Sequence, residues 1–284
     1  MDSSEEVKWD IVVGSKKGWF EIDFVEIWKY RDLLWLLVRR DFISFYKQTV
    51  LGPLWFLAQP TFTMIVYVFI FGRLANISTE EIPRPLFYMS GITAWAFFSD
   101  NLRRTATVLL DSKDIFGKVF FPRIIVPLSI VISSLIKYGF QVLFLIVMML
   151  VFAVQGANFS VTNYVLLFPL LIAILGLQGL GFGLLVSSLT IKYRDLSLFI
   201  GFSLQLLTYA TSVIYPLSSL SGTAKFLVSL NPVTYVLEGM RLGLFGSGTF
   251  DMMGLLYISL VTLVVLSLGV IVFSKAEKDF IDSI

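Results

Sequence analysis

The sequence predicts an all-α, polytopic membrane protein with six transmembrane helices, and three observations support this fold class. Hydrophobic residues make up 57% of the 284 residues and charged residues only 15%, whereas an ordinary globular chain is about 25% charged. The mean hydropathy is +0.84. The 54 residues from Tyr138 to Ile191 contain no Asp, Glu, Lys or Arg. Because a spanning helix takes about 20 residues, this run holds two crossings with a turn between them.

Uncharged runs place the six spans in order along the chain. The expected spans are residues 48–72, 85–99, 124–154, 163–190, 196–216 and 252–274. The second is the shortest, and Lys137 interrupts the third. Residues 49–274 therefore form the six-span transmembrane domain, between a cytoplasmic and interfacial segment, 1–48, and a cytoplasmic tail, 275–284. An even number of spans puts both termini on the same side.

The distribution of Lys and Arg orients these spans, because short cytoplasmic loops retain basic residues. With the N-terminus inside, 17 of the 22 Lys and Arg fall in cytoplasmic segments and four fall in outer segments. Both termini and residues 111–123 are therefore expected in the cytoplasm, with residues 75–84 and 217–250 outside. The first residues, Met-Asp-Ser-Ser-Glu-Glu, do not have the pattern of a signal peptide.

Three segments are expected to be more than connections. Residues 15–48 mix aromatic and basic residues and are too charged to span, which predicts an amphipathic helix lying in the inner interface. Residues 217–250 are long and mostly apolar for an outer loop, which predicts a re-entrant pair of short helices covered by protein. Asn231-Pro232 would begin the second of them. Residues 111–123 form a compact cytoplasmic loop with charges around three Phe residues.

Composition excludes several function classes. The absence of Cys and His excludes thiol chemistry, disulfides and His or Cys metal sites, and it removes the usual general base. A membrane-embedded enzyme would need clustered acids, His or Cys, and this chain is poor in them. A secondary transporter usually needs ionisable groups at the bilayer midplane. Lys137 is the only clear candidate for such a group, so that class is a weaker competitor.

Four short motifs occur in the order that one transporter family shows. They are Arg39-Arg40-Asp41-Phe42 leading to Tyr46 through Trp55 and Gln59-Pro60; Phe121-Pro122-Arg123 with Pro127; Tyr193-Arg194-Asp195-Leu196; and Asn231-Pro232 with Glu238 and Arg241. With these motifs at matching positions, nearly the whole chain resembles the membrane subunit of a type 2 ABC exporter. The resemblance is to the branch that exports polysaccharides such as O antigen, capsule and teichoic acid. One departure is Thr211-Ser212, where the family often has Ser-Pro before Tyr215-Pro216.

The resemblance implies partners and a location. The family works as a dimer of this subunit with two copies of a separate cytoplasmic ABC ATPase, in the bacterial inner membrane, among membrane lipids. The chain has no Gly-x-x-x-x-Gly-Lys-Ser/Thr motif, so it is not expected to be an enzyme or to hold a cofactor, and ATP and Mg²⁺ are expected on the partner. The substrate implied is a lipid-linked or growing polysaccharide, and no nucleic acid is expected. Teichoic acid or a small hydrophobic molecule remains an alternative substrate.

Family topology implies that residues 111–123 carry a coupling helix that docks on the ATPase. Asp111 or Ser112 can cap such a helix, and Phe116 and Phe120, four residues apart, share one face. A second cytoplasmic turn follows the fourth span and either docks or only anchors the chain by charge. The expected coupling residues are Asp111, Lys113, Phe116, Lys118, Phe120, Arg123, Lys192, Arg194 and Asp195.

The second span carries the expected substrate pathway. Its outer half is rich in aromatic residues, which either form an interfacial belt or offer flat faces on which a sugar chain slides, as stacking platforms do elsewhere. Its inner end carries two Arg residues that face a watery channel or the cytoplasm. The expected pathway residues are Phe87, Tyr88, Trp95, Phe98, Arg103 and Arg104.

Two further features concern charges in or near spans. Lys137 either snorkels to the inner interface or lines the pathway, and no acidic partner is visible in another span. Glu238 and Arg241, three apart on an expected helix, predict a local ion pair that holds the outer re-entrant helices.

Overall fold

The computed structural model describes residues 24–281 except residues 48, 113–120 and 194. The described residues are helical with short connections, and no strand occurs among them. The predicted all-α class is therefore confirmed, and long apolar helices make the chain a polytopic membrane protein.

The helices correspond to the predicted spans with shifts of a few residues. The first span consists of a 3₁₀ turn, Gly52–Leu54, then α3 (Trp55–Tyr67) and a π-helical segment, Val68–Leu74. The second is α4 (Arg84–Ala106) and the third is α7 (Ile125–Val154). A 3₁₀ segment, Asn163–Leu167, and α8 (Phe168–Lys192) form the fourth. The fifth is α9 (Leu196–Tyr209), and the sixth is α12 (Met252–Ile281).

Four helical segments of the described chain are long and apolar enough to cross a membrane: Gly52–Leu74, Ile125–Val154, Asn163–Lys192 and Met252–Glu277. The other two predicted spans differ from these in composition or length. α4 has 23 residues but carries several charges at its inner end, and α9 has only 14 residues. The number of six spans therefore stays a prediction.

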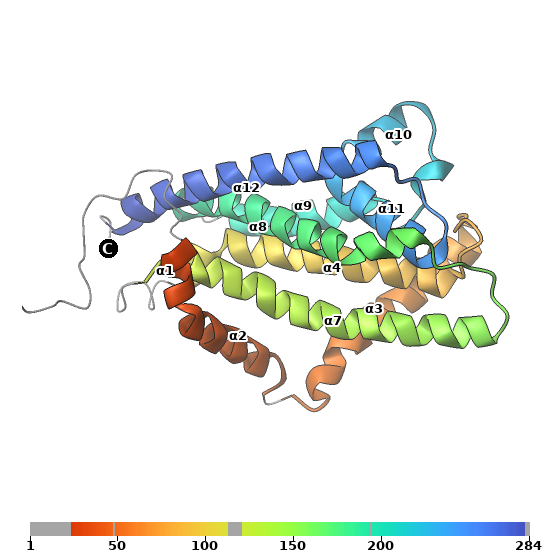
Figure 1. Ribbon diagram of the computed structural model, residues 1–284, viewed down its shortest axis with the longest axis horizontal. Helices are drawn as coiled ribbons and strands as arrows, with labels where there is room; N and C mark the ends of the chain where they lie inside the picture. Colours follow the sequence, from red (N-terminus) through yellow and green to blue (C-terminus); the bar gives the residue numbers. More distant parts are fainter. Residues whose placement is uncertain (1–23, 48, 113–120, 194, 282–284) are drawn as a thin grey trace, which may run out of the picture.

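Close packing of α4, α8 and α12 forms the centre of the molecule, where these helices run lengthwise beside one another (Figure 1). Glycines on α8 allow the approach. A Cβ on Gly183 would lie 2.5 Å from Cβ of Thr105 on α4, and a Cβ on Gly269 of α12 would lie 2.6 Å from the carbonyl oxygen of Gly181. Such small-residue contacts are how membrane helices pack without a hydrophobic driving force. We call these three helices the central block.

The remaining helices lie around the central block. α7 packs on α4, α3 packs on both, and α9 packs on α4 and α8. At one end lie α1 (Phe24–Lys29), α2 (Arg31–Tyr46), α5 (Val108–Asp111) and the end of α12. The opposite end carries α10 (Gly222–Ser229) and α11 (Pro232–Phe245) (Figure 1). We call these the inner and the outer end, after the orientation that the sequence predicts.

The inner end has its own apolar cluster. α2 packs along α7 and buries Leu37 and Val38, while Trp35 and Leu36 on its other side are exposed. The exposed residues of α2 thus include apolar ones beside charged ones such as Asp32, Arg39 and Arg40, a mixture that suits the interfacial position that the sequence predicts for this segment. Leu37 joins a buried cluster formed with residues of α5, α7, α8 and α12.

The outer end contains the two short helices expected before the last span. Asn231 caps α11, since its side chain accepts a 3.1 Å hydrogen bond from the backbone N–H of Val233, and Pro232 fills the first helical position. α11 ends at Gly246, whose φ of 76° is a left-handed conformation that glycine adopts without strain. α12 continues beyond the predicted sixth span to Ile281, so most of the predicted tail, 275–284, is helical, and its cytoplasmic position stays a prediction.

Candidate functional site

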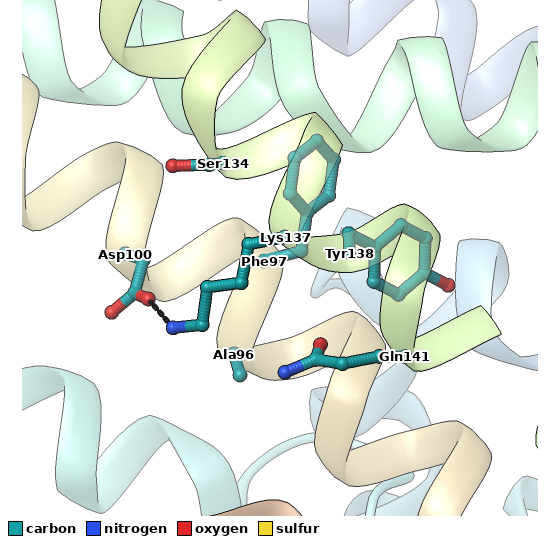
Figure 2. A pocket seen from close by; sticks show the side chains of 7 residues that line it. All are labelled: Ala96, Phe97, Asp100, Ser134, Lys137, Tyr138 and Gln141. Carbon is teal, nitrogen blue, oxygen red and sulfur yellow. Dashed lines mark hydrogen bonds and ion pairs between the residues drawn. The ribbon is translucent and has the colours of Figure 1, made fainter. Parts of the chain in front are cut away.

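A charged cluster lies between α4 and α7 in their inner halves (Figure 2). Lys137 Nζ donates a 2.7 Å hydrogen bond to Asp100 Oδ2, and Arg103 Nη2 lies 3.7 Å from Asp100 Oδ1. The expectation that Lys137 has no acidic partner in another span is therefore wrong. The partner was missed because the two residues are 37 positions apart and meet only when α4 and α7 pack side by side.

A small cavity of about 10 Å³ adjoins this ion pair, roughly the room that one water molecule needs. Its lining residues are Ala96, Phe97, Asp100, Ser134, Lys137, Tyr138 and Gln141. Gln141 adds a further polar contact beside the cavity: its side-chain Nε2 donates a 3.0 Å hydrogen bond to the backbone carbonyl of Phe56 at the start of α3. Polar groups thus join α3, α4 and α7 at this depth.

A second ion pair ties the interfacial helix to α4. Asp41 of α2 is buried between Arg40, whose Nη2 lies 3.0 Å from Asp41 Oδ1, and Arg104, whose Nη2 lies 2.5 Å from Asp41 Oδ2. The sequence did not indicate this pair, although Asp41 lies in one of the quoted motifs. Arg104 is therefore held by α2 rather than open to a channel, whereas the Arg103 side chain is 60% exposed.

The two ion-paired groups have the adjacent residues Arg103 and Arg104 of α4 as members, and we call their six residues together the inner polar cluster: Arg40, Asp41, Asp100, Arg103, Arg104 and Lys137. It contains four cations and two carboxylates, so it carries a net positive charge. Ionisable groups at membrane depth are costly and usually functional. A net positive, partly exposed cluster at the inner end is suited to attract an anionic group.

The aromatic residues of α4 that were expected to line the pathway lie inside the subunit, and we call them the aromatic stripe. Phe87, Tyr88, Trp95 and Phe98 are all buried. The Trp95 and Phe98 ring centroids are 5.4 Å apart, and Phe98 makes an edge contact with Phe182 of α8. Contrary to expectation, these side chains offer no free face to a sugar chain in this structure. A membrane helix is apolar both toward lipid and toward neighbouring helices. The spacing of apolar residues in the sequence therefore did not reveal that the stripe faces other helices of the subunit.

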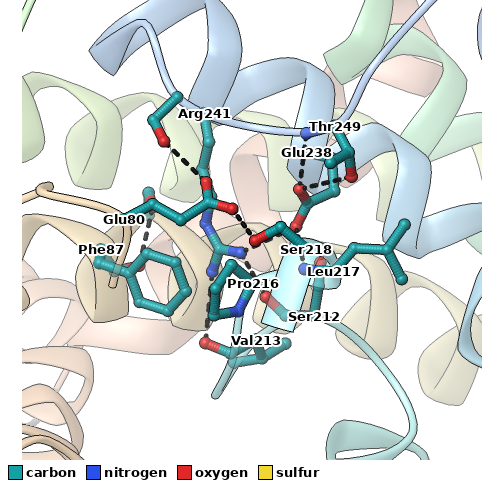
Figure 3. A network of polar contacts seen from close by, with 12 residues as sticks. Glu80, Phe87, Ser212, Val213, Pro216, Leu217, Ser218, Glu238, Arg241 and Thr249 are labelled. Atoms are coloured by element: carbon teal, nitrogen blue, oxygen red, sulfur yellow. Dashed lines mark hydrogen bonds and ion pairs between the residues drawn. The ribbon is translucent and has the colours of Figure 1, made fainter. Parts of the chain in front are cut away.

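A buried polar network stabilises the outer end (Figure 3). Glu238 and Arg241 on α11 form the pair that their spacing predicts, with 3.4 Å between Arg241 Nη1 and Glu238 Oε1, and they are 0% and 1% exposed. Glu238 also accepts hydrogen bonds from the backbone N–H of Leu217 (3.3 Å) and from the N–H and hydroxyl of Thr249 (2.9 and 3.1 Å). One carboxylate therefore joins α11 to the chain before α10 and the chain before α12.

Arg241 extends this network toward α4 and α9. Its Nη1 and Nη2 donate to the backbone carbonyls of Ser212 (2.5 Å) and Val213 (3.3 Å), and its guanidinium lies 3.7 Å from the ring centroid of Phe87. Gly91 leaves the room for this, since a Cβ there would lie 2.9 Å from Arg241 Nη2. Phe87 is thus a platform for a buried cation.

Glu80 forms the rim of the outer network. Its carboxylate accepts hydrogen bonds from the hydroxyls of Ser218 and Ser247, the latter at 2.7 Å. The φ of Glu80 is 51°, a left-handed conformation that is strained for a residue with a side chain. These contacts hold the strained turn before α4 against the loops on either side of α10 and α11.

The predicted coupling elements are described only in part. Lys113, Phe116, Lys118, Phe120 and Arg194 lie outside the described residues. Asp111 ends α5, and its carboxylate accepts a 2.6 Å hydrogen bond from the hydroxyl of Thr107.

In the second predicted coupling turn, the described residues Lys192, Tyr193 and Asp195 are exposed. Lys192 Nζ lies 5.5 Å from the ring centroid of Tyr193, and Asp195 directly precedes α9. Arg123, by contrast, is buried and bound to α12. A direct contact of these residues with an ATPase stays a prediction.

Sequence comparison decides the family. Residues 32–245 match the sequence model described as ABC-2 type transporter. The chain belongs to the ABC-2 type transporter family. The matched region begins in α2 and ends at the last residue of α11, so it includes both the inner polar cluster and the buried outer ion pair.

Curated relatives of similar length are export or transport proteins by name. The O-antigen export system permease protein RfbA of Myxococcus xanthus is 28% identical over 262 residues, which cover 91% of this chain and 98% of the relative. The protein of the same name from Klebsiella pneumoniae is 25% identical over 252 residues, covering 88% and 93%. The polysialic acid transport protein KpsM of Escherichia coli is 23% identical over 248 residues, covering 87% and 94%.

Proposed function

We propose that this protein is the membrane permease of an ATP-driven exporter that moves a polysaccharide across the bacterial inner membrane. The observation that carries the proposal is the likeness over almost the full length of both chains to permeases named for O-antigen export and to a polysialic acid transporter. Because these relatives differ in the polymer that they are named for, the common class is polysaccharide.

The energy for this transport comes from a separate subunit in our proposal. The sequence contains no Gly-x-x-x-x-Gly-Lys-Ser/Thr stretch that would cradle nucleotide phosphates. Two copies of the permease would pair with two copies of a cytoplasmic ATPase that binds ATP and Mg²⁺. The bias of Lys and Arg toward residues 111–123 and both terminal segments supports a cytoplasmic position of these parts.

The inner polar cluster is the proposed entry to the pathway. Its net positive charge and the exposed Arg103 suit the phosphate of a lipid-linked polymer, since Arg presents a planar fork of donors to phosphate oxygens. The Asp100–Lys137 pair lies deeper along α4 and α7 and would meet the chain next. The aromatic stripe is buried inside the subunit. In this proposal it packs behind the pathway and does not form the surface that the polymer contacts.

The test is deletion of the gene in its own organism. Surface polysaccharide is expected to disappear while polymer accumulates inside the cell, and the wild-type gene is expected to restore export. A strain that lacks polymer synthesis is the control, because it shows neither surface nor internal polymer. Unchanged surface polysaccharide in the deletion strain would contradict the proposed function.

A further inference from the structure

The end of the cytoplasmic loop is held by the last turns of α12. Arg123 Nη1 donates a 3.0 Å hydrogen bond to the backbone carbonyl of Glu277, and Arg123 Nε lies 3.6 Å from Glu277 Oε1. These residues are 154 positions apart in the sequence. The contact therefore joins two distant segments at the inner end, and it exists because α12 continues beyond its apolar part.

The burial of Arg123 distinguishes it from a docking residue. Arg123 is 9% exposed, and a buried charge needs a partner because its desolvation is otherwise uncompensated. Glu277 provides both a carboxylate and a carbonyl oxygen. A long Arg side chain in a surface loop is able to extend its guanidinium into water, yet this one is turned into the subunit. That placement fits a group that positions its own loop.

Apolar contacts support the same junction. Phe121, two residues before Arg123, and Phe273, one helical turn before Glu277, are buried in the same cluster. Val108 and Leu109 of α5, just before the loop, belong to it as well. Both ends of the loop are therefore fixed to one cluster, to which α12 contributes the buried Phe273.

α12 connects this junction to the centre of the molecule. It packs against α8 at backbone distance through Gly181 and Gly269, and α8 packs in the same way against α4 through Gly183. Energetic coupling between distant sites travels through packed, rigid elements of this kind. A displacement of the loop end would thus be transmitted to the central block through packed helices.

We propose that Arg123 is a positioning residue that clamps residues 121–123 to Glu277 of α12, so that the docking loop and the central block move as one body when the partner hydrolyses ATP. This inference rests on the proposed function. Arg123 acts here through Glu277, and contact with the ATPase is left to other residues of the loop.

Two readouts test the clamp in Arg123→Gln, Glu277→Gln and the double reversal Arg123→Glu/Glu277→Arg. The first is polymer exported per ATP hydrolysed, by the permease purified with its ATPase and reconstituted in vesicles. The second is the rate of trypsin cleavage after Lys118, which needs no transport. Each single variant is expected to lower the export ratio and to raise the cleavage rate, both about twofold to thirtyfold, while the ATPase still co-purifies. The double reversal is expected to recover part of both.

Lys29→Gln is the matched control, since it removes an exposed charge from α1 at the same end of the molecule without removing the Glu277 carboxylate, and it is expected to leave both readouts unchanged. Wild-type readouts in both single variants would overturn the clamp, as would a double reversal no better than the single variants. Loss of ATPase co-purification in Arg123→Gln but not in Glu277→Gln would also overturn it, because Arg123 would then be a docking residue. If the wild type shows no ATP-dependent export, the proposed function fails, and the cleavage rates still decide whether the clamp exists.

Discussion

Arg241 and Glu238 show how single residues stabilise a membrane protein away from water. Both are almost fully buried, and together they bond to backbone groups of three other segments. The cost of desolvating two charges is offset only when each has a partner with good geometry. Phe87 adds its ring face to the guanidinium, which explains why an aromatic residue occupies this position at the outer end of α4.

Arg241→Met is therefore expected to destabilise the protein strongly, by about 3–5 kcal/mol, because it leaves the buried Glu238 carboxylate with its neutral hydrogen-bond donors but without its ion-pair partner. The measurement is thermal or denaturant unfolding of the purified protein in detergent. Arg103→Met is the matched control: its side chain is mostly exposed, and an exposed pair contributes about 1 kcal/mol or less. Equal stability of the two variants would mean that the outer network does not hold this end of the molecule.

At the scale of elements, α8 is the helix that determines how closely the others approach. Its glycines face α4 on one side and α12 on the other, and each lies where a Cβ would meet backbone or a rigid side chain. From hydropathy alone, α8 is predicted only to be a long apolar helix. The spacing of its glycines contains the packing information, because small residues mark the contact faces of membrane helices.

Gly183→Ala is expected to push α8 away from α4, since the new Cβ would lie 2.5 Å from Cβ of Thr105 and 2.9 Å from the carbonyl oxygen of Leu102. Overpacking of this kind costs about 1–3 kcal/mol. Gly139→Ala in α7 is the control, because no atom lies within 4 Å of its Cβ and alanine is favoured in a helix by about 0.5–1 kcal/mol. The midpoint of thermal unfolding should fall in the first variant and not in the second; the opposite order would refute the packing argument.

The sequence predicted the helices well, because the hydrocarbon of the membrane requires long apolar segments. It predicted side-chain contacts between helices poorly, because these depend on how the helices pack. Spans, the two outer helices and the Glu238–Arg241 pair follow from apolar length, an Asn-Pro start and helical spacing. Asp100 and Lys137 were not paired, because their contact depends on how α4 and α7 pack. The helical extension that brings Glu277 to Arg123 was also missed, since charges at 275–278 resemble a tail once the apolar run ends.

The whole molecule has a central block with α2 at one end and, at the other, α10 and α11 with the buried Glu238–Arg241 pair. The inner end combines a net positive cluster with the Arg123–Glu277 contact, so proposed substrate entry and proposed coupling share the same end of α4, α7 and α12. This arrangement would let hydrolysis in the cytoplasm act where substrate enters.

We propose that ATP hydrolysis by a partner drives polysaccharide through this permease. The most direct measurement places the permease and its ATPase in sealed vesicles with the ATPase facing outward and follows the entry of labelled polysaccharide. We predict entry that requires hydrolysable ATP and both subunits, and that stops with a non-hydrolysable analogue. Entry driven by an ion gradient in vesicles that contain the permease alone would contradict the account and make the protein a secondary transporter.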